Sequence, residues 1–125
     1  MFFFPFADEN PTKKKPIISW SIIFVCSFIF FNQIFEPIYI IEQTFLSFGM
    51  IPAILFGYSE LSGPLKIIHP FLSVFTSMFL HGGWMHIIGN MTYLYIFGDN
   101  IEERLGKFKF IIFYIVTGIV AALSQ

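Results

Sequence analysis

The sequence predicts an all-α membrane protein, and its composition and the spacing of its apolar residues both support this fold class. Hydrophobic residues fill 56% of the 125 positions and charged residues only 12%, whereas about a quarter of a soluble domain is charged. The apolar residues gather in runs close to membrane length. The net charge of −1 and the lack of a basic stripe with interleaved aromatics argue against nucleic-acid binding. We therefore expect the lipid bilayer as a partner and no nucleic acid.

The first apolar run, residues 17–35, predicts a transmembrane helix that follows a cytoplasmic tail at residues 1–16. The tail closes with three lysines and with Pro16, a residue suited to the first position of a helix. At ~1.5 Å per residue, the run nearly crosses the ~30 Å of a hydrocarbon core. A signal peptide is the alternative, but the run is too long and no small-residue cleavage site follows it. Cys26, which has no second cysteine to pair with, is expected to pack as a small hydrophobe.

Residues 36–80 predict a long loop lying in the membrane interface. The segment is apolar throughout but is interrupted by polar residues and helix breakers, namely Glu42, Gln43, Gly49, Pro52, Gly57, Glu60, Gly63, Pro64 and Lys66. Glycine and proline divide it into short pieces. Short helices with apolar surface, lying flat in the interface, are the structure that fits this pattern.

Two further transmembrane helices are expected at residues 81–98 and 107–125. Basic residues cluster before the first helix and between these two, whereas the long loop carries one lysine, Lys66. Because cytoplasmic loops are enriched in lysine and arginine, we expect the N-terminus in the cytoplasm. The chain is thus predicted to be a multi-pass integral protein of the plasma (inner) membrane. Residue 81 then lies near the outer face.

A polar pair marks the start of the second of these helices. His86 and Asn90 are four residues apart, so they share one helix face. Imidazole and carboxamide groups are costly inside lipid, so the pair is expected to face protein or a wet cavity. Asparagine and histidine side chains both serve as donors in the oxyanion holes of acyl-transfer enzymes. The pair is therefore the candidate site.

Longer segments around this pair resemble the rhomboid intramembrane serine proteases. Residues 76–90 (TSMFLHGGWMHIIGN) and 95–106 (YIFGDNIEERLG) are similar to the family's second transmembrane helix and the turn after it. Residues 48–53 (FGMIPA) resemble its first loop, and residues 110–125 resemble its third helix. This combination is specific, although a lone His-x-x-x-Asn pattern would not be. The resemblance identifies residues 17–125 as a partial rhomboid domain.

The resemblance implies a rhomboid-like bundle of six transmembrane helices, three of them in this chain, that cleaves transmembrane protein substrates with a serine nucleophile and a histidine base. It implies that His86 and Asn90 help to stabilise the tetrahedral intermediate. It also matches Glu102 and Arg104 to a structural clasp that shapes the loop, where an exposed pair would contribute little to stability. No cofactor is implied, because this chemistry uses side chains alone. The oligomeric state is left open.

The chain departs from the family in its nucleophile. The family's serine lies in a Gly-x-Ser-Gly motif on the fourth helix and its base lies on the sixth, and neither helix is found here. Ser62 is followed by Gly63, but the glycine required before it is missing, so we reject Ser62 as a nucleophile. With oxyanion donors but no nucleophile or base, this chain is expected to be inactive alone and to be the N-terminal portion of a protease.

Two other functions stay open. A rhomboid-like pseudoprotease would bind transmembrane clients without cutting them, and a small helical membrane protein would have a structural role. The presence of both His86 and Asn90 favours descent from an active enzyme, because a pure binder needs no oxyanion hole.

The other residues near the pair are given structural roles. His81 precedes Gly82 and Gly83 at the mouth of the helix, where it is expected to cap a turn rather than to bind substrate or water. The glycine pair is expected to end the loop, and Gly89 to permit close contact with another helix. No metal site is expected, because the five-residue offset of His81 and His86 turns them apart on a continuous helix and no third ligand is evident.

Overall fold

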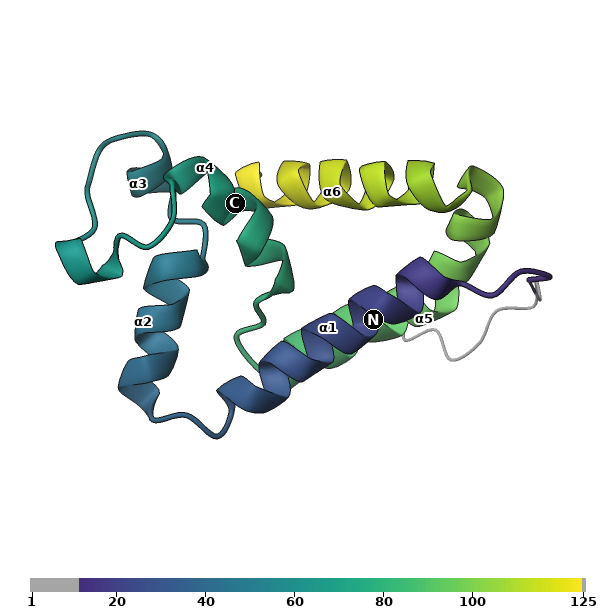
Figure 1. Cartoon of the computed structure of the whole chain (residues 1–125), viewed down its shortest axis with the longest axis horizontal. Helices are drawn as coiled ribbons and strands as arrows, with labels where there is room; N and C mark the ends of the chain where they lie inside the picture. The colour runs from purple at the N-terminus through teal and green to yellow at the C-terminus, as the bar shows by residue number, and fades with distance from the viewer. Residues whose placement is uncertain (1–11, 125) are drawn as a thin grey trace, which may run out of the picture. The chain divides into compact units, whose positions relative to one another are not determined.

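The computed structural model describes residues 12–124, and all regular structure in this range is helical (Figure 1). The α-helices, in chain order, are α1 (Ile17–Gln33), α2 (Ile38–Phe48), α3 (Pro52–Leu55), α4 (Pro70–Thr76), α5 (Trp84–Leu105) and α6 (Lys107–Leu123). The 3-10 turns η1 (Gly63–Leu65) and η2 (Ser77–Phe79) precede and follow α4. The predicted all-α class is confirmed for these residues. Residues 1–11 of the predicted tail, and Gln125, lie outside the described range.

The chain divides into two compact units, each built from segments that are distant in sequence. Unit 1 joins the segment that ends at Phe28 to His81–Tyr114, and so contains most of α1, all of α5 and the start of α6. Unit 2 joins Ile29–Leu80 to the segment that begins at Ile115, and contains α2, α3 and α4.

The three predicted spans are not confirmed as separate membrane-length helices. Within residues 12–124, Ile38–Leu55 is the one stretch that is long and apolar enough by itself, with a mean hydropathy of 1.5 over 18 residues. Pro70–Phe79 and Trp84–Leu105 qualify only if they are counted together as one broken span, and α1 is apolar but has 17 residues. The apolar stretch falls inside the predicted interfacial loop, where α2 ends at Phe48 and α3 begins at Pro52.

Each predicted span overlaps a helix but differs from it at the ends. The helix predicted at 17–35 ends at Gln33, and the helix predicted at 107–125 ends at Leu123. The helix predicted at 81–98 begins at Trp84 and continues to Leu105. It stops there because Gly106 adopts φ +80° and ψ 161°, a conformation that is essentially restricted to glycine. The sharp corner at Gly106 leads directly into α6.

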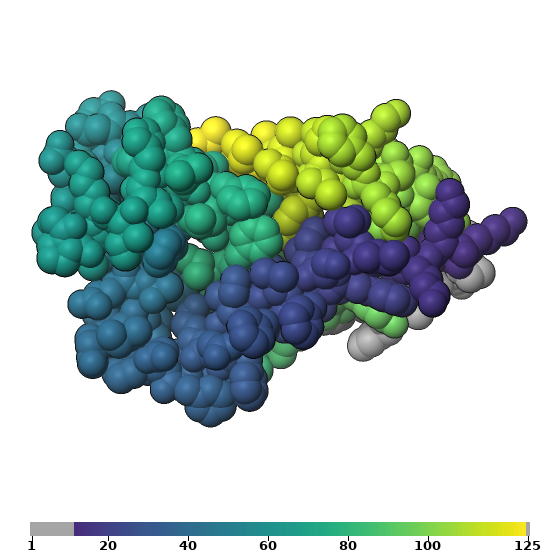
Figure 2. Space-filling view, in the orientation of Figure 1, coloured from purple at the N-terminus to yellow at the C-terminus, as the bar shows by residue number. Residues whose placement is uncertain are grey.

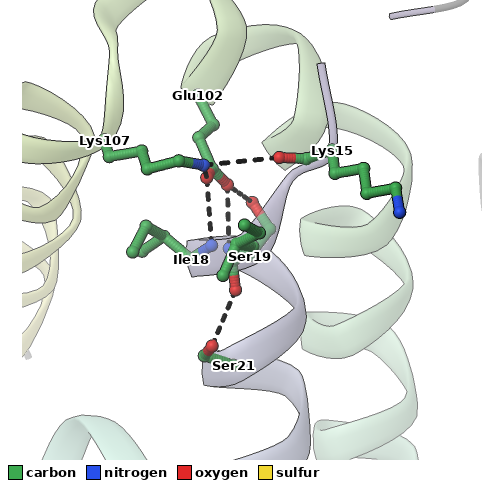
Figure 3. A network of polar contacts seen from close by, with 7 residues as sticks. Lys15, Ile18, Ser19, Ser21, Glu102 and Lys107 are labelled. Carbon is green, nitrogen blue, oxygen red and sulfur yellow. Dashed lines mark hydrogen bonds and ion pairs between the residues drawn. The ribbon is translucent and has the colours of Figure 1, made fainter.

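A buried carboxylate joins the start of α1 to the end of α5 (Figure 3). The Glu102 side chain is 3% exposed. Its Oε1 accepts the backbone N–H of Ile18 at 3.0 Å, and its Oε2 accepts the backbone N–H and the hydroxyl of Ser19, each at 2.9 Å. Lys107 Nζ lies 3.3 Å from Oε1 and forms an ion pair with it. Glu102 therefore bonds two elements that are more than eighty residues apart in sequence.

This carboxylate acts as the N-terminal cap of α1. The first-turn N–H groups of a helix have no partner within the helix, and a negative charge there also interacts favourably with the helix dipole. The first turn of α1 contains no acidic residue, so Glu102 supplies both the acceptor and the charge from another segment. The Ile17 N–H donates to the Lys15 carbonyl at 2.9 Å. The described start of α1 thus has its backbone donors satisfied.

A glycine lets α5 approach α1 beside this cap. A Cβ built on Gly98 would lie 2.8 Å from Ser19 Oγ and 2.9 Å from a methyl group of Leu94. At Gly89 a Cβ would meet nothing within 4 Å in the described chain. The close contact that the sequence predicted at Gly89 therefore occurs at Gly98. Only the tertiary structure shows that Ser19 lies opposite Gly98 and not opposite Gly89.

Unit 2 is held by contacts of α2 with α4 and η1, and of α3 with α4. Thr76 Oγ1 donates to the carbonyl oxygen of Phe48, so the end of α4 is tied to the end of α2. At the start of α4, His69 Nδ1 accepts the N–H of Phe71 at 3.3 Å and caps the helix. The Met78 side chain packs directly on Gly118 of α6.

The Glu102→Gln variant tests the cap through its pH dependence. Burial alone would raise the pKa of Glu102, which lies beyond the predicted span 81–98, but the backbone and side-chain donors lower that pKa below its ordinary value. A lowered pKa contributes stability that is present above the unfolded-state value of about 4.3 and is lost as the pH falls through the folded-state value. Glu102→Gln should lower the unfolding free energy by about 1–3 kcal/mol at pH 7 and remove most of this acid-dependent loss.

Unfolding in detergent micelles, followed by circular dichroism from pH 3 to pH 7, measures this effect. Glu103→Gln is the matched control, because Glu103 accepts one exposed backbone bond from Lys13. An equal change in both variants would contradict the assigned role of Glu102.

Alanine substitutions at the two glycines should have opposite effects. Gly89→Ala removes backbone freedom in a helix where a methyl group has room, so it should stabilise the protein by about 0.5–1 kcal/mol. Gly98→Ala pushes against Ser19, whose hydroxyl is bonded to Glu102, and should destabilise the protein by about 1–3 kcal/mol. Parallel thermal unfolding of the two variants checks the sign, and stabilisation by both would show that α1 does not pack closely at Gly98.

Candidate functional site

The structure gathers three polar side chains at the start of α5. His86 and Asn90 lie one turn apart in the first two turns of the helix, and both are exposed. His81 lies in the turn before the helix and is 2% exposed. We refer to His81, His86 and Asn90 as the polar cluster. All three belong to unit 1.

Two contacts define the geometry of the polar cluster. Asn90 Nδ2 lies 3.3 Å from His81 Nε2, within hydrogen-bond distance. The rings of His81 and His86 meet edge to face, with centroids 5.0 Å apart and planes inclined at 64°. His81 thus contacts both members of the pair that the sequence singled out.

The direction of the bond to Asn90 determines what the cluster can donate. The amide nitrogen is the donor, so His81 Nε2 accepts and carries no proton on that atom. An amide group has two N–H bonds, so a second one remains on Asn90. No side chain caps the N–H groups in the first turn of α5, to which His86 belongs. The positive end of the helix dipole therefore favours a partial negative charge near His86.

The prediction that His81 and His86 turn apart is wrong. It assumed one continuous helix through both residues, but α5 begins at Trp84 and Gly83 precedes it in an extended conformation. The turn at Gly82 and Gly83 folds the His81 ring back toward α5, so the two rings meet. No group of three or more potential metal ligands occurs within residues 12–124.

Glu102 and Arg104 lie at the other end of α5. Twelve residues separate Asn90 from Glu102, which is about 18 Å along a helix. Glu102 pairs with Lys107 rather than with Arg104, and Arg104 is exposed. These two residues are therefore outside the polar cluster, and Glu102 acts on it only through the position of α5.

The rejected serine, Ser62, belongs to unit 2, where it precedes η1 in an extended conformation. Unit 2 also contains a cavity of about 270 Å³, whose lining includes Ser47, Ile51, Leu61 and Lys66. None of the residues of the polar cluster lines this cavity.

Sequence reasoning missed two sets of contacts. The contact of His81 with Asn90 was missed because helical spacing was applied across Gly82 and Gly83, although a Gly-Gly pair is a signal for a chain reversal. The bonds from Ser19 to Glu102 were missed because no local pattern links residues that are 83 positions apart. The absence of an acidic residue at the start of α1 was the available signal that a cap had to come from elsewhere.

Comparison with known proteins agrees with the sequence resemblance. Residues 69–125 match the family model described as the Rhomboid domain. A stretch of 48 residues is 42% identical to "Rhomboid-like protein 11, chloroplastic" of Arabidopsis thaliana. The match covers 38% of this chain and 17% of that protein. No solved structure matches the chain.

The family model covers α4, α5 and α6 and therefore includes the whole polar cluster. Together with the apolar stretch Ile38–Leu55, the match indicates a membrane protein. Residues 69–125 are therefore similar to a Rhomboid domain, and the chain spans about a sixth of the length of the curated relative that it matches.

Proposed function

We propose that this chain supplies the oxyanion-stabilising part of a rhomboid intramembrane serine endopeptidase that cleaves transmembrane protein substrates. The observation that carries the proposal is the polar cluster itself, in which the amide of Asn90 is held by His81 beside His86. The family match over the same residues supports this assignment.

The proposed chemistry is acyl transfer to a serine. A serine hydroxyl attacks the scissile carbonyl carbon, its proton passes to a histidine base, and the carbonyl electron pair moves onto the oxygen. The remaining N–H of Asn90 and a ring N–H of His86 donate to this oxygen. The 125-residue sequence contains no Gly-x-Ser-Gly motif, so the nucleophile and the base come from other parts of the protease. The 125-residue chain alone is inactive in this proposal.

His81 has a positioning role in this scheme. An oxyanion hole is effective when its donors are already oriented before charge develops, because no reorganisation is then needed during the reaction. The bond from Asn90 Nδ2 to His81 Nε2 restricts rotation of the amide. Since His81 is buried and Asn90 is exposed, the bond ties an exposed side chain to a buried one.

We propose that α1, α5 and α6 cross the membrane and that α2, α3 and α4 lie in its interface. The 22 residues of α5 extend about 33 Å, enough for a hydrocarbon core, and the 17 residues of α1 and of α6 each extend about 25 Å. The large apolar side chains exposed on α1 and α6 suit a lipid environment, among them Phe24, Phe28, Phe31, Ile112, Val116 and Val120. The basic residues before α1 favour a cytoplasmic N-terminus.

Asn90→Ala in the protein translated from the whole gene tests the oxyanion assignment. The variant loses one donor that acts in the transition state, so kcat should fall by ~10 to 1000-fold with little change in KM. Asn100→Ala is the matched control, because Asn100 lies ten residues further along α5. Cleavage of a transmembrane reporter reconstituted with each variant gives the rates.

A fluorophosphonate probe, which labels reactive serines, distinguishes an active serine protease from a rhomboid-like pseudoprotease. The whole-gene product should be labelled on a serine, and the 125-residue chain should not. Labelling with unchanged kcat in Asn90→Ala would remove Asn90 from the mechanism. Crosslinking of a transmembrane client to a product that is neither labelled nor proteolytic would instead establish a pseudoprotease.

A further inference from the structure

Six basic side chains gather in unit 1 around the C-terminal end of α5. The polar cluster lies at the opposite, N-terminal end of this helix. Three of the basic side chains come from the segment before α1 and three from the corner between α5 and α6. We call them the basic patch: Lys13, Lys14, Lys15, Arg104, Lys107 and Lys109. All six are exposed, and Figure 2 shows the purple segment before α1 projecting at the molecular surface.

Hydrogen bonds bring the two halves of the basic patch together. The backbone N–H of Lys13 donates to Glu103 Oε1 at 2.9 Å. Lys107 Nζ donates to the carbonyl oxygen of Lys15 at 3.4 Å (Figure 3). The Glu102 cap holds the adjoining first turn of α1. The lysines before α1 are therefore fixed next to the α5–α6 corner although they are about ninety residues away in sequence.

The acidic residues nearby offset only half of the charge of the basic patch, because Asp99, Glu102 and Glu103 carry three negative charges against its six positive ones. Glu102 is buried, and it forms the one ion pair found within residues 12–124, with Lys107. Glu103 uses an oxygen for the Lys13 backbone. Asp99 accepts the N–H of Asn100 at 2.7 Å and the hydroxyl of Thr12 at 3.5 Å. Their carboxylates thus bond mainly to backbone and hydroxyl donors, and five of the six basic side chains form no ion pair with described residues.

Exposed apolar side chains border the basic patch. Phe108, between Lys107 and Lys109, is 76% exposed, and Trp20 in the first turns of α1 is 49% exposed. A basic surface next to exposed apolar groups matches a phospholipid, which presents phosphate above acyl chains. Basic residues close to a membrane-embedded helix attract anionic headgroups. A soluble anion would use only the charged part of this surface.

We propose that the basic patch binds the headgroup phosphates of anionic phospholipids at the membrane surface. Lys13, Lys14 and Lys15 contact the headgroups, and Phe108 and Trp20 contact the upper parts of the acyl chains. The binding anchors the start of α1 and the α5–α6 corner to one leaflet. It involves no residue of the polar cluster and does not depend on proteolytic activity.

Tryptophan quenching by brominated lipids tests the proposal at two places in the same chain. The chain has two tryptophans. Trp20 follows Lys15 by five residues in the first turns of α1, and Trp84 begins α5 twenty residues before Arg104, about 30 Å along the helix. The Trp84→Phe variant reports on Trp20 alone, and Trp20→Phe reports on Trp84 alone. Each variant is reconstituted into phosphatidylcholine vesicles with a fixed fraction of brominated phosphatidylglycerol or of brominated phosphatidylcholine.

The expected result is local selectivity for the anionic lipid. At Trp20, brominated phosphatidylglycerol should bind about three to ten times more strongly than brominated phosphatidylcholine, whereas at Trp84 the two should be equal. Replacing Lys13, Lys14 and Lys15 together by glutamine should remove the selectivity and leave the backbone bonds intact. Replacement of the same three by arginine should keep it, and molar salt should weaken it.

Lys66→Gln is the matched control for loss of a lysine elsewhere, and it should leave the quenching at Trp20 unchanged. Equal quenching by the two lipids at Trp20, or the same anionic preference at Trp84, would overturn the proposal. So would unchanged selectivity in the triple glutamine variant. Abolition of the selectivity by millimolar glycerophosphate, which has the phosphate but no acyl chains, would show a site for free anions and overturn the lipid assignment.

Discussion

The structure of unit 1 depends on the carboxylate of Glu102. It accepts the first backbone donors of α1, pairs with Lys107 at the start of α6, and is almost fully buried. A buried charge is tolerated only when its bonding capacity is satisfied, and here backbone, hydroxyl and ammonium donors all reach it. Three helices therefore meet at one side chain. The close approach at Gly98 and the sharp corner at Gly106 both lie within a turn or so of it.

The same helix carries the cap at one end and the polar cluster at the other. Because α5 is one helix from Trp84 to Leu105, the position of Glu102 against α1 also sets the direction of the turn that presents Asn90. His81 then fixes the amide locally. This division is suited to catalysis, in which oxyanion donors must be held in place before the charge develops. The proposed protease function rests on this arrangement and on the rhomboid match over the same residues.

Charge is distributed along α5 in a way that also suits a membrane. The polar cluster contains no lysine, arginine or carboxylate, and most basic residues stand beyond the other end of the helix. Between them lie apolar residues, with Ile96 buried and Tyr95 and Phe97 exposed. Lipid headgroups at the basic patch would hold that end of the helix at a fixed depth. The depth of the polar cluster would follow from the length of α5.

The sequence by itself determined the helical class, the placing of His86 and Asn90 on one helix, and the resemblance to rhomboids, because these depend on composition and local spacing. It did not determine where each helix begins and ends, because the ends depend on backbone breaks such as the one at Gly106. Only the tertiary structure decided that Glu102 caps α1, that Gly98 rather than Gly89 is the close contact, and that His81 holds Asn90. Each of these pairs residues across a chain reversal or between distant segments, and no periodic pattern in a sequence encodes such a pairing.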